Sequence, residues 1–464
     1  MPDVRPGTGS LRGYRAALIL LVWVWSAIVL AANLPGHLTS DSLIQIIEGR
    51  AGLVESFNPL FGSWVFGGLT EWTGGTEIHV LLLTLLLAGA VVALLWRLPG
   101  SFWGALAGLA TAAVLLFSPI LLTYPGIIWK DVWFAHCCLL AFGLIALRQG
   151  GAGWWAEVAA LALLAAGMLS RQTGLLVALV AVLSLTLLAG RLQATGEGRV
   201  PMHRPVLGFV ARVVVLFMMA SALNTAARTT MREVQRDSVG TGVMLVAMFD
   251  MAGMLQRLPG VELQRMRSEG FQTAEWEAAA RTTFSAERID RMDLRPFRGD
   301  RTLEAGTLLR QWAALVLDHP GTYLAHRLHT FAWFGGLEDQ SRCLPVHVGI
   351  EPPDLAAKAG IRATPSRWSP VLYAYSRTLV DTPYFAPLAW SGVSLLVLFL
   401  LAWRRRWDDP VLWLQVAGLL YSASYLPAGL SCDFRYSYFS VAAATLGLIR
   451  MVLDGLPLPR SQHA

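Results

Sequence analysis

The chain has 464 residues, of which 55% are hydrophobic and only 15% are charged, whereas about a quarter of the residues of a soluble domain are charged. With a mean hydropathy of +0.51, this composition excludes an ordinary soluble protein and predicts a polytopic membrane protein. The formal net charge of +6 comes mostly from arginine, and no basic helix is interleaved with stacking aromatic residues, so a nucleic-acid partner is not indicated.

Apolar runs of close to twenty residues, the length that crosses about 30 Å of hydrocarbon, recur along the chain. They predict a mainly α-helical transmembrane bundle of about ten spans, at 12–33, 78–97, 101–118, 132–148, 154–170, 173–190, 207–224, 385–403, 411–428 and 438–455. With the N-terminus inside, most arginines of the short loops fall on the inner side. The positive-inside rule therefore predicts that both termini are cytoplasmic.

The first outer loop, 34–77, is too polar to span a membrane and too apolar to be an ordinary loop. On a helix, Asp41, Gln45 and Glu48 share one face, opposite an apolar face. We expect Ser40 to cap this helix and Gly49 to end it. Such a helix would lie in the outer membrane interface with its carboxylates facing an aqueous or catalytic space. A solvated amphipathic loop without an active role is the alternative.

A second interfacial helix is predicted directly after the first. It would begin at Pro59, with Asn58 as its cap, and run through "LFGSWVFGGLTEW" to the pair Gly74 and Gly75.

The spans divide into seven and three around a long, richly charged segment. We therefore expect an N-terminal transmembrane module at 1–224, a mostly helical extracytoplasmic domain at 225–384 and C-terminal transmembrane helices at 385–464. Within the insert, 305–334 carries apolar residues at the three- and four-residue spacing of a helix.

Four basic residues, Arg50, Lys130, Arg171 and Arg435, fall in the outer short loops against the positive-inside pattern, and the last three are singled out by their position. Lys130 lies at the outer end of the fourth span, Arg171 in a short outer turn and Arg435 at the start of the last span, all at about the depth of Asp41. Charges at membrane level are usually paired or functional, and arginine and lysine are natural phosphate ligands. A carboxylate that deprotonates a hydroxyl, beside cations that stabilise a leaving phosphate, suits glycosyl transfer from a lipid phosphate.

Each cation alone also has a structural explanation. Lys130 could pair with Asp131 and Arg435 with Asp433, or the side chains could snorkel to the interface.

The four cysteines fit no zinc or redox motif, and the histidines are not spaced as a metal site. Cys343 and Cys432 would both lie on the outer side, where a disulfide between them is one possibility.

The chain resembles the GT-C superfamily of polytopic membrane glycosyltransferases, which includes protein O-mannosyltransferases and lipid A aminoarabinose transferases. The resemblance is carried by short motifs in family order: "TSDSLIQIIEG", "FNPLFGSWVFG", "IIWKDVWFA", "LSRQTGLL" and "DFRYSYFSV". The seven spans before the insert resemble the seven-helix module of one GT-C class. Two positions depart from the family pattern, because Ser42 follows Asp41 and Asn58 replaces a histidine before proline.

The resemblance implies an inverting transfer of a monosaccharide from a polyprenyl-phosphate donor to an acceptor hydroxyl. Asp41 would be the catalytic base, and Lys130, Arg171 and Arg435 would bind the donor phosphate. A second carboxylate or a substrate contact could come from Glu48, Glu55, Asp131, Gln45 or Tyr436. No obligatory metal is expected, although a divalent cation could take part.

The resemblance also implies a multi-pass protein of the bacterial cytoplasmic (inner) membrane with its active site on the extracytoplasmic side. The acceptor could be a glycan, a lipid or a protein. The main alternative is a transporter or flippase of a lipid-linked or anionic substrate, which predicts charges near mid-membrane; a non-catalytic assembly protein is the third reading.

Overall fold

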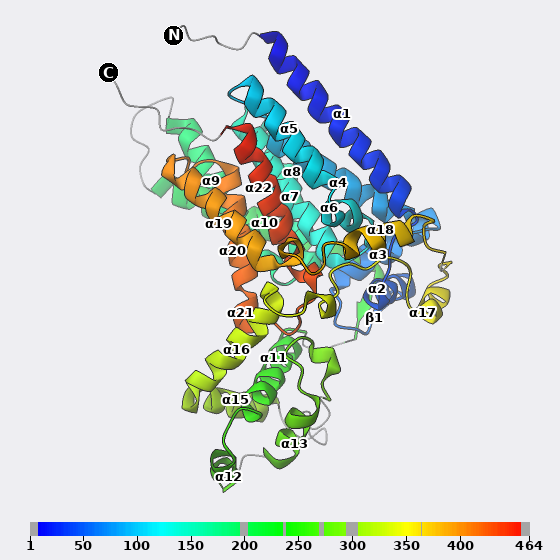
Figure 1. Cartoon of the computed structure of the whole chain (residues 1–464), viewed down its shortest axis with the longest axis vertical. Coiled ribbons are helices and arrows are strands. Elements are labelled where there is room, and N and C mark those ends of the chain that lie inside the picture. Colours follow the sequence, from blue (N-terminus) through cyan, green and yellow to red (C-terminus); the bar gives the residue numbers. More distant parts are fainter. Residues whose placement is uncertain are drawn as a thin grey trace.

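The structure is a computed structural model that describes residues 8–194, 203–234, 238–268, 273–293, 305–362 and 364–455. It is a bundle of long helices with a smaller helical unit projecting from one end (Figure 1). The helices of the bundle are α1 (Thr8–Asn33), α4 (Glu77–Leu95), α5 (Phe102–Leu116), α6 (Pro119–Thr123), α7 (Lys130–Gln149), α8 (Trp154–Ser170), α9 (Gly174–Ala194), α10 (His203–Thr230), α19 (Pro387–Trp403), α20 (Pro410–Ala423), α21 (Tyr425–Ala428) and α22 (Tyr438–Leu453).

Each predicted span coincides with a helix of the bundle. Within the described residues, six helices are long and apolar enough to cross a membrane, and the pair α5 and α6, bent by 64°, adds a seventh if it counts as one span. The apolar helices α8, α9 and α19 are shorter. A helical membrane protein is therefore confirmed, whereas the number of spans and their orientation stay predictions.

Of the six candidate spans, α22 and α7 are the most buried and α10 the least. Polar side chains join α22 to its neighbours: Ser422 Oγ on α20 donates to Ser440 Oγ on α22 at 2.8 Å, and Gln415 Nε2 donates to the Ala443 carbonyl at 3.0 Å. Hydrogen bonds of this kind fix helices that lipid would not drive together. They hold α22, and with it the segment that precedes it, in one position.

The first outer loop contains two helices, as predicted, but their ends differ. Helix α2 (Ser40–Ala51) has Thr39, not Ser40, as its N-cap, and it ends at Gly52, whose φ of 67° requires glycine. Helix α3 (Leu60–Thr73) has Pro59, not Asn58, as its N-cap, and it ends at Gly74. Whether the two helices lie in a membrane interface stays a prediction.

Gly49 lies inside α2 because α3 crosses it there. A Cβ on Gly49 would overlap the backbone of Ser63 and Gly67, and a Cβ on Gly67 would overlap the backbone of Gly49. The two glycines therefore allow close backbone contact between α2 and α3. The predicted helix stop at Gly49 was wrong because this glycine serves the crossing and not a turn.

Short backbone pairings fix the entry to α2. The N–H of His37 donates to the carbonyl of Gly126, and Ile128 donates back to His37. Leu38 is paired in the same way with the segment at 349–351 of the insert. A two-residue parallel sheet, β1 (Leu53–Val54) with β2 (Arg232–Glu233), ties the α2–α3 loop to the segment after α10.

The insert holds α11 (Ser238–Leu255), α12 (Gly260–Ser268), α13 (Thr273–Thr283), α15 (Ala305–Asp318), α16 (Pro320–Gly335), α17 (Pro353–Lys358) and α18 (Ser369–Arg377). The helical pattern predicted at 305–334 is two helices, α15 and α16, separated at His319. The buried carboxylate of Asp250 on α11 joins α16, because His326 Nε2 lies 3.0 Å and Arg327 Nε 2.7 Å from it.

The insert is fastened to the segment that precedes α22. A disulfide joins Cys343 to Cys432, with their Cα atoms 5.1 Å apart. Residues 287–289 also form an antiparallel bridge with 430–432, through Ile289 N to Leu430 O at 2.9 Å and Cys432 N to Glu287 O at 2.8 Å. The insert therefore helps to position Arg435, three residues after the disulfide.

The glycine crossing gives a stability test. Gly67→Ala should lower the melting temperature of the purified protein, because overpacking of the α2–α3 contact costs about 1–3 kcal/mol. Gly68→Ala is the matched control: a Cβ at that position meets nothing within 4 Å, so the melting temperature should stay the same or rise slightly. Equal melting temperatures for both variants would contradict the close crossing.

Candidate active site

The four charged residues singled out in the sequence lie at one end of the bundle. Asp41 is in the first turn of α2, Lys130 is the first residue of α7, Arg171 follows α8, and Arg435 lies in the short 3-10 turn Phe434–Ser437 before α22. The opposite end holds the start of α1 and the end of α22, since Tyr14 donates to the Leu95 carbonyl and Arg450 to the Arg97 carbonyl.

Asp41 and Arg435 form a direct ion pair, with 2.7 Å between Oδ2 and Nη1. Arg435 Nη2 lies 3.4 Å from Asp433, so part of the local pairing considered from the sequence is also present. The guanidinium stacks on two rings, 5.1 Å from the centroid of Trp129 and 5.0 Å from that of Tyr436. The two rings and the two carboxylates together fix the position of this arginine.

Asp131 links the two arginines. It forms an ion pair with Arg171, and its Oδ2 lies 4.0 Å from Arg435 Nε. Arg171 also donates to the hydroxyl of Tyr425 and, at 3.2 Å, to that of Thr173. Asp131 therefore pairs with Arg171, not with Lys130 as one reading of the sequence had it.

Lys130 has a neutral partner. Its Nζ donates to Asn58 Oδ1 at 2.7 Å, which explains why the asparagine before Pro59 does not cap α3. An ammonium group has three donors, and this bond uses one of them. Lys130 is the cation of this group whose bonding to the described residues leaves the most capacity for a ligand.

Exposure separates the carboxylates. The Asp41 side chain is 40% exposed, whereas those of Asp131 and Asp433 are 1% and 2% exposed. The two buried aspartates are counter-ions that hold arginines in place. Asp41 is the carboxylate of the three that a solute can reach.

The environment of Asp41 keeps it ionised. Burial by itself would raise the pKa of this carboxyl, but the charges of Arg435, Lys130 and Arg288 outweigh it and hold the pKa below its ordinary value of 3.8. Asp41 can therefore accept a proton at neutral pH.

Two residues predicted on the face of Asp41 have other roles. Glu48, 6% exposed, accepts from the backbone N–H groups of Glu55 (2.9 Å) and Ser56 (2.6 Å) and from the Ser63 hydroxyl (3.1 Å). It thereby braces the α2–α3 loop. Gln45, 1% exposed, is packed beside Gly62 of α3, so the predicted aqueous face of α2 is mostly covered.

Of the two remaining candidate residues, one lies in the charged cluster and the other does not. Tyr436 lies inside the cluster, between Arg171 at 4.7 Å and Arg435 at 5.0 Å from its ring centroid, and its hydroxyl accepts from Arg435 at 3.2 Å. Glu55 is exposed in the loop between α2 and α3.

The structure adds Arg288, which the sequence analysis missed. Its Nη2 lies 2.7 Å from Asp433 Oδ1, and it reaches this position through the bridge between 287–289 and 430–432. Arg288 is far from Asp433 in sequence, so no local pattern points to the pair. With it, the cluster holds four cations, Lys130, Arg171, Arg288 and Arg435. They lie among four carboxylates, Asp41, Asp131, Asp433 and Glu48, the last of which interacts with Lys130, so the formal charges balance.

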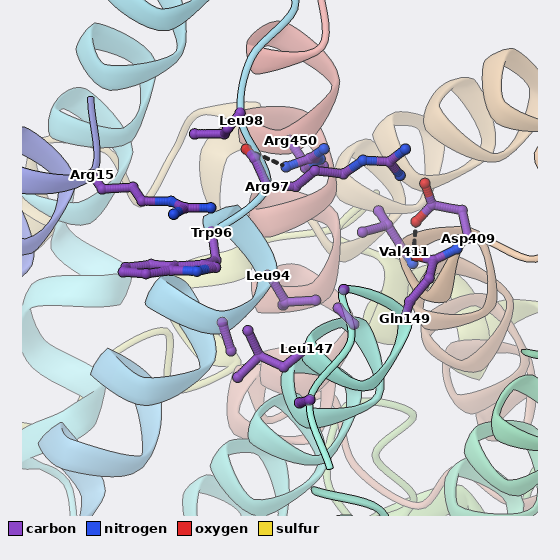
Figure 2. A pocket seen from close by; sticks show the side chains of 14 residues that line it. Arg15, Leu94, Trp96, Arg97, Leu98, Leu147, Gln149, Asp409, Val411 and Arg450 are labelled. Atoms are coloured by element: carbon purple, nitrogen blue, oxygen red, sulfur yellow. Dashed lines mark hydrogen bonds between the residues drawn. The ribbon is translucent and has the colours of Figure 1, made fainter. Parts of the chain in front are cut away.

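Two other cavities lie away from this cluster. Figure 2 shows one of about 580 Å³ at the end of the bundle where α1 begins and α22 ends; there Arg15 lies over the ring of Trp96, 4.6 Å from its centroid. Arg97 and Arg450 also line it, and the positive-inside rule predicts that these arginines lie on the inner side. The second, of about 590 Å³, lies in the insert. Within the described ranges, no group of three His, Cys, Asp or Glu side chains has the arrangement of a metal site.

Comparison with known proteins yields little. No protein-family model and no curated protein matches the chain. Among solved structures, it is similar to the archaeal oligosaccharyltransferase AglB from Archaeoglobus fulgidus, determined in complex with an inhibitory peptide and a dolichol-phosphate. The TM-score is 0.37 and the identity 12%, over 93% of this chain and 50% of that one, so the chain spans about half its length. A similarity this low carries no argument about activity.

Proposed function

We propose that the protein is an inverting glycosyltransferase that moves a monosaccharide from a polyprenyl phosphate to an acceptor hydroxyl. The observation that carries the proposal is the Asp41 carboxylate, which is ionised, accessible and 2.7 Å from Arg435, with Lys130 and Arg288 close enough to lower its pKa. A base beside a cationic site is what such a reaction needs, since a proton must be removed where a phosphate departs.

The reaction is a single displacement. The acceptor hydroxyl gives its proton to Asp41 as its oxygen bonds to the anomeric carbon of the donor sugar. The bond between that carbon and the phosphate oxygen breaks, and its electron pair leaves with the polyprenyl phosphate. One accessible carboxylate suits one direct displacement, and a direct displacement inverts the anomeric configuration.

The cations have unequal roles. Arg171 already binds Asp131, Tyr425 and Thr173, so it mainly orders the cluster. Lys130 has donors to spare and contacts the leaving phosphate most directly. Arg435 stabilises the same charge while it keeps the Asp41 carboxylate ionised. The side chains supply the positive charge that a divalent ion supplies for nucleotide sugars, so full activity in EDTA is expected.

The disulfide supports an extracytoplasmic site. Cys343 and Cys432 lie at the same end of the bundle as Arg435, and disulfides persist in oxidising compartments. The arginine-rich opposite end fits the cytoplasmic face. We infer a bacterial cytoplasmic membrane with the acceptor, be it a glycan, a lipid or a protein, approaching from outside.

The transporter or flippase reading is the weaker one. It expects charged residues near the middle of the membrane, along a path. The ion pairs around Asp41 instead join residues at helix ends: the first turns of α2 and α7, the turn after α8 and the turn before α22.

Asp41→Asn tests the base. Transfer from a synthetic polyprenyl-phosphate sugar should fall by about 10²–10⁴-fold, because the amide cannot take the proton. Asp354→Asn is the matched control, an exposed aspartate in the first turn of α17, and it should keep full activity. Near-normal turnover by a folded Asp41→Asn variant would remove the proposed mechanism.

Lys130→Gln tests the phosphate contact. We expect kcat to fall by about 10²-fold or more, because the leaving charge loses a cation, while the melting temperature changes little. Lys130→Arg should recover part of the rate. The chain's other lysine provides the control, since Lys358→Gln on exposed α17 should have no effect on kcat. If Lys130→Gln and Lys358→Gln had equal kcat values, residues other than Lys130 would bind the phosphate.

The pH profile of transfer tests the coupling of Asp41 to Arg435. In the unmodified protein the acidic limb should lie below the ordinary pKa of aspartate, because the cations outweigh burial. Arg435→Gln removes the principal lowering charge and leaves burial, so the limb should move upward by about 1–3 pH units. Arg435→Lys should shift it less. The test compares the pH at which activity falls and not the maximal rate. If Arg435→Gln leaves the acidic limb in place, that limb does not report the ionisation of Asp41.

A further inference from the structure

The cavity of about 590 Å³ in the insert is lined by residues that the candidate active site does not use. They come from the turn after α11, the segment at 284–291, α16 and the turn after it, and include Arg257, Glu287, Arg291, His329, Trp333 and Arg342. Its volume is that of an ordinary small-molecule site. None of the residues that line it belongs to a candidate span of the bundle.

The cavity has more positive than negative charge. Three arginines line it with one carboxylate, because Arg291 and Arg342 both pair with Oε1 of Glu287, the latter at 2.7 Å. Arg257 has neutral partners, the Gly253 carbonyl at 2.6 Å and His329 Nδ1 at 2.8 Å. Two positive charges are therefore left for an anion.

Glu287 also offers a hydrogen-bond acceptor. Its side chain is 3% exposed, and within the described residues its Oε2 has no hydrogen-bond partner. A buried carboxylate oxygen without a partner is costly, and a ligand hydroxyl would satisfy it. Trp333 lines the same cavity and supports the guanidinium of Arg342, 5.6 Å from its ring centroid. Arginines that bind anionic groups, a carboxylate oxygen that accepts a hydrogen bond from a hydroxyl, and an aromatic ring together match the groups of an acidic sugar.

A series of ion pairs connects the cavity to the candidate active site. Glu287 precedes Arg288, which lies 2.7 Å from Asp433; Asp433 lies 3.4 Å from Arg435, the partner of Asp41. The disulfide and the bridge to 430–432 hold the same two segments together. The cavity and the candidate active site are thus built on the same two joined segments, 287–289 and 430–435.

We propose that this cavity binds the acceptor, and that the acceptor is a saccharide carrying carboxylate or phosphate groups. The identification of the ligand as the acceptor rests on the proposed transfer, whereas the binding of an anionic saccharide does not depend on it. The anionic groups contact Arg257 and Arg342, and a sugar hydroxyl donates to Glu287 Oε2.

The test is binding without donor, by calorimetry on the full-length protein in nanodiscs. Trigalacturonic acid should bind, and neutral maltotriose should bind at least about ten-fold more weakly, because charge-assisted hydrogen bonds are lost. Arg342→Gln, at a side chain that is 51% exposed, should weaken binding of the acidic trisaccharide by about ten-fold, as should Arg257→Gln. The exposed Arg310→Gln on α15 is the control and should bind as the unmodified protein does.

Three outcomes would overturn the proposal: equal binding of both trisaccharides, no effect of either arginine variant, or inorganic phosphate binding as tightly as trigalacturonic acid, which would mean an anion site without sugar recognition. Asp41→Asn separates this proposal from the transferase mechanism, because it should bind trigalacturonic acid normally. If the acidic sugar binds but no polyprenyl-phosphate donor supports transfer, the site stands and the transferase proposal fails.

Discussion

The buried carboxylate of Asp131 is the interaction on which the candidate site depends. It lies at the start of an apolar helix, between Arg171 and Arg435, and its side chain is almost completely shielded from solvent. Removing one partner from a buried ion pair costs about 3–5 kcal/mol, because the other charge remains uncompensated. The two arginines are therefore held at fixed positions, and Asp41 can pair with Arg435 while it stays accessible.

A network of this kind needs rigid support, and the supports come from distant parts of the chain. The backbone pairings at His37 and Leu38 set the entry to α2, and Glu48 braces the loop that follows it. On the other side, the Cys343–Cys432 disulfide and the bridge at 287–289 fix the segment before α22. The insert is thus more than a separate outer domain. It completes the cluster with Arg288 and contains a charged cavity of its own.

The structure also shows how one helix can carry two kinds of carboxylate. Asp41 and Glu48 share a face of α2 by their spacing, yet one is exposed beside an arginine and the other is covered by α3. The crossing of Gly49 and Gly67 brings α3 close enough for this difference. Spacing on a helix predicts which residues share a direction, whereas the neighbouring helix decides what each of them meets.

The sequence alone determined the helical membrane class, the position of each long helix of the bundle, and the presence of Asp41, Lys130, Arg171 and Arg435 at one end of that bundle. Hydropathy, helical period and charge asymmetry are local properties, so they can be read along the chain. Only the tertiary structure decided which carboxylate is accessible, that Asn58 serves Lys130, that Asp131 belongs to Arg171, and that Arg288 takes part. A charge at the edge of an apolar bundle must find a partner, but which partner it finds depends on residues that folding brings from far away in the chain.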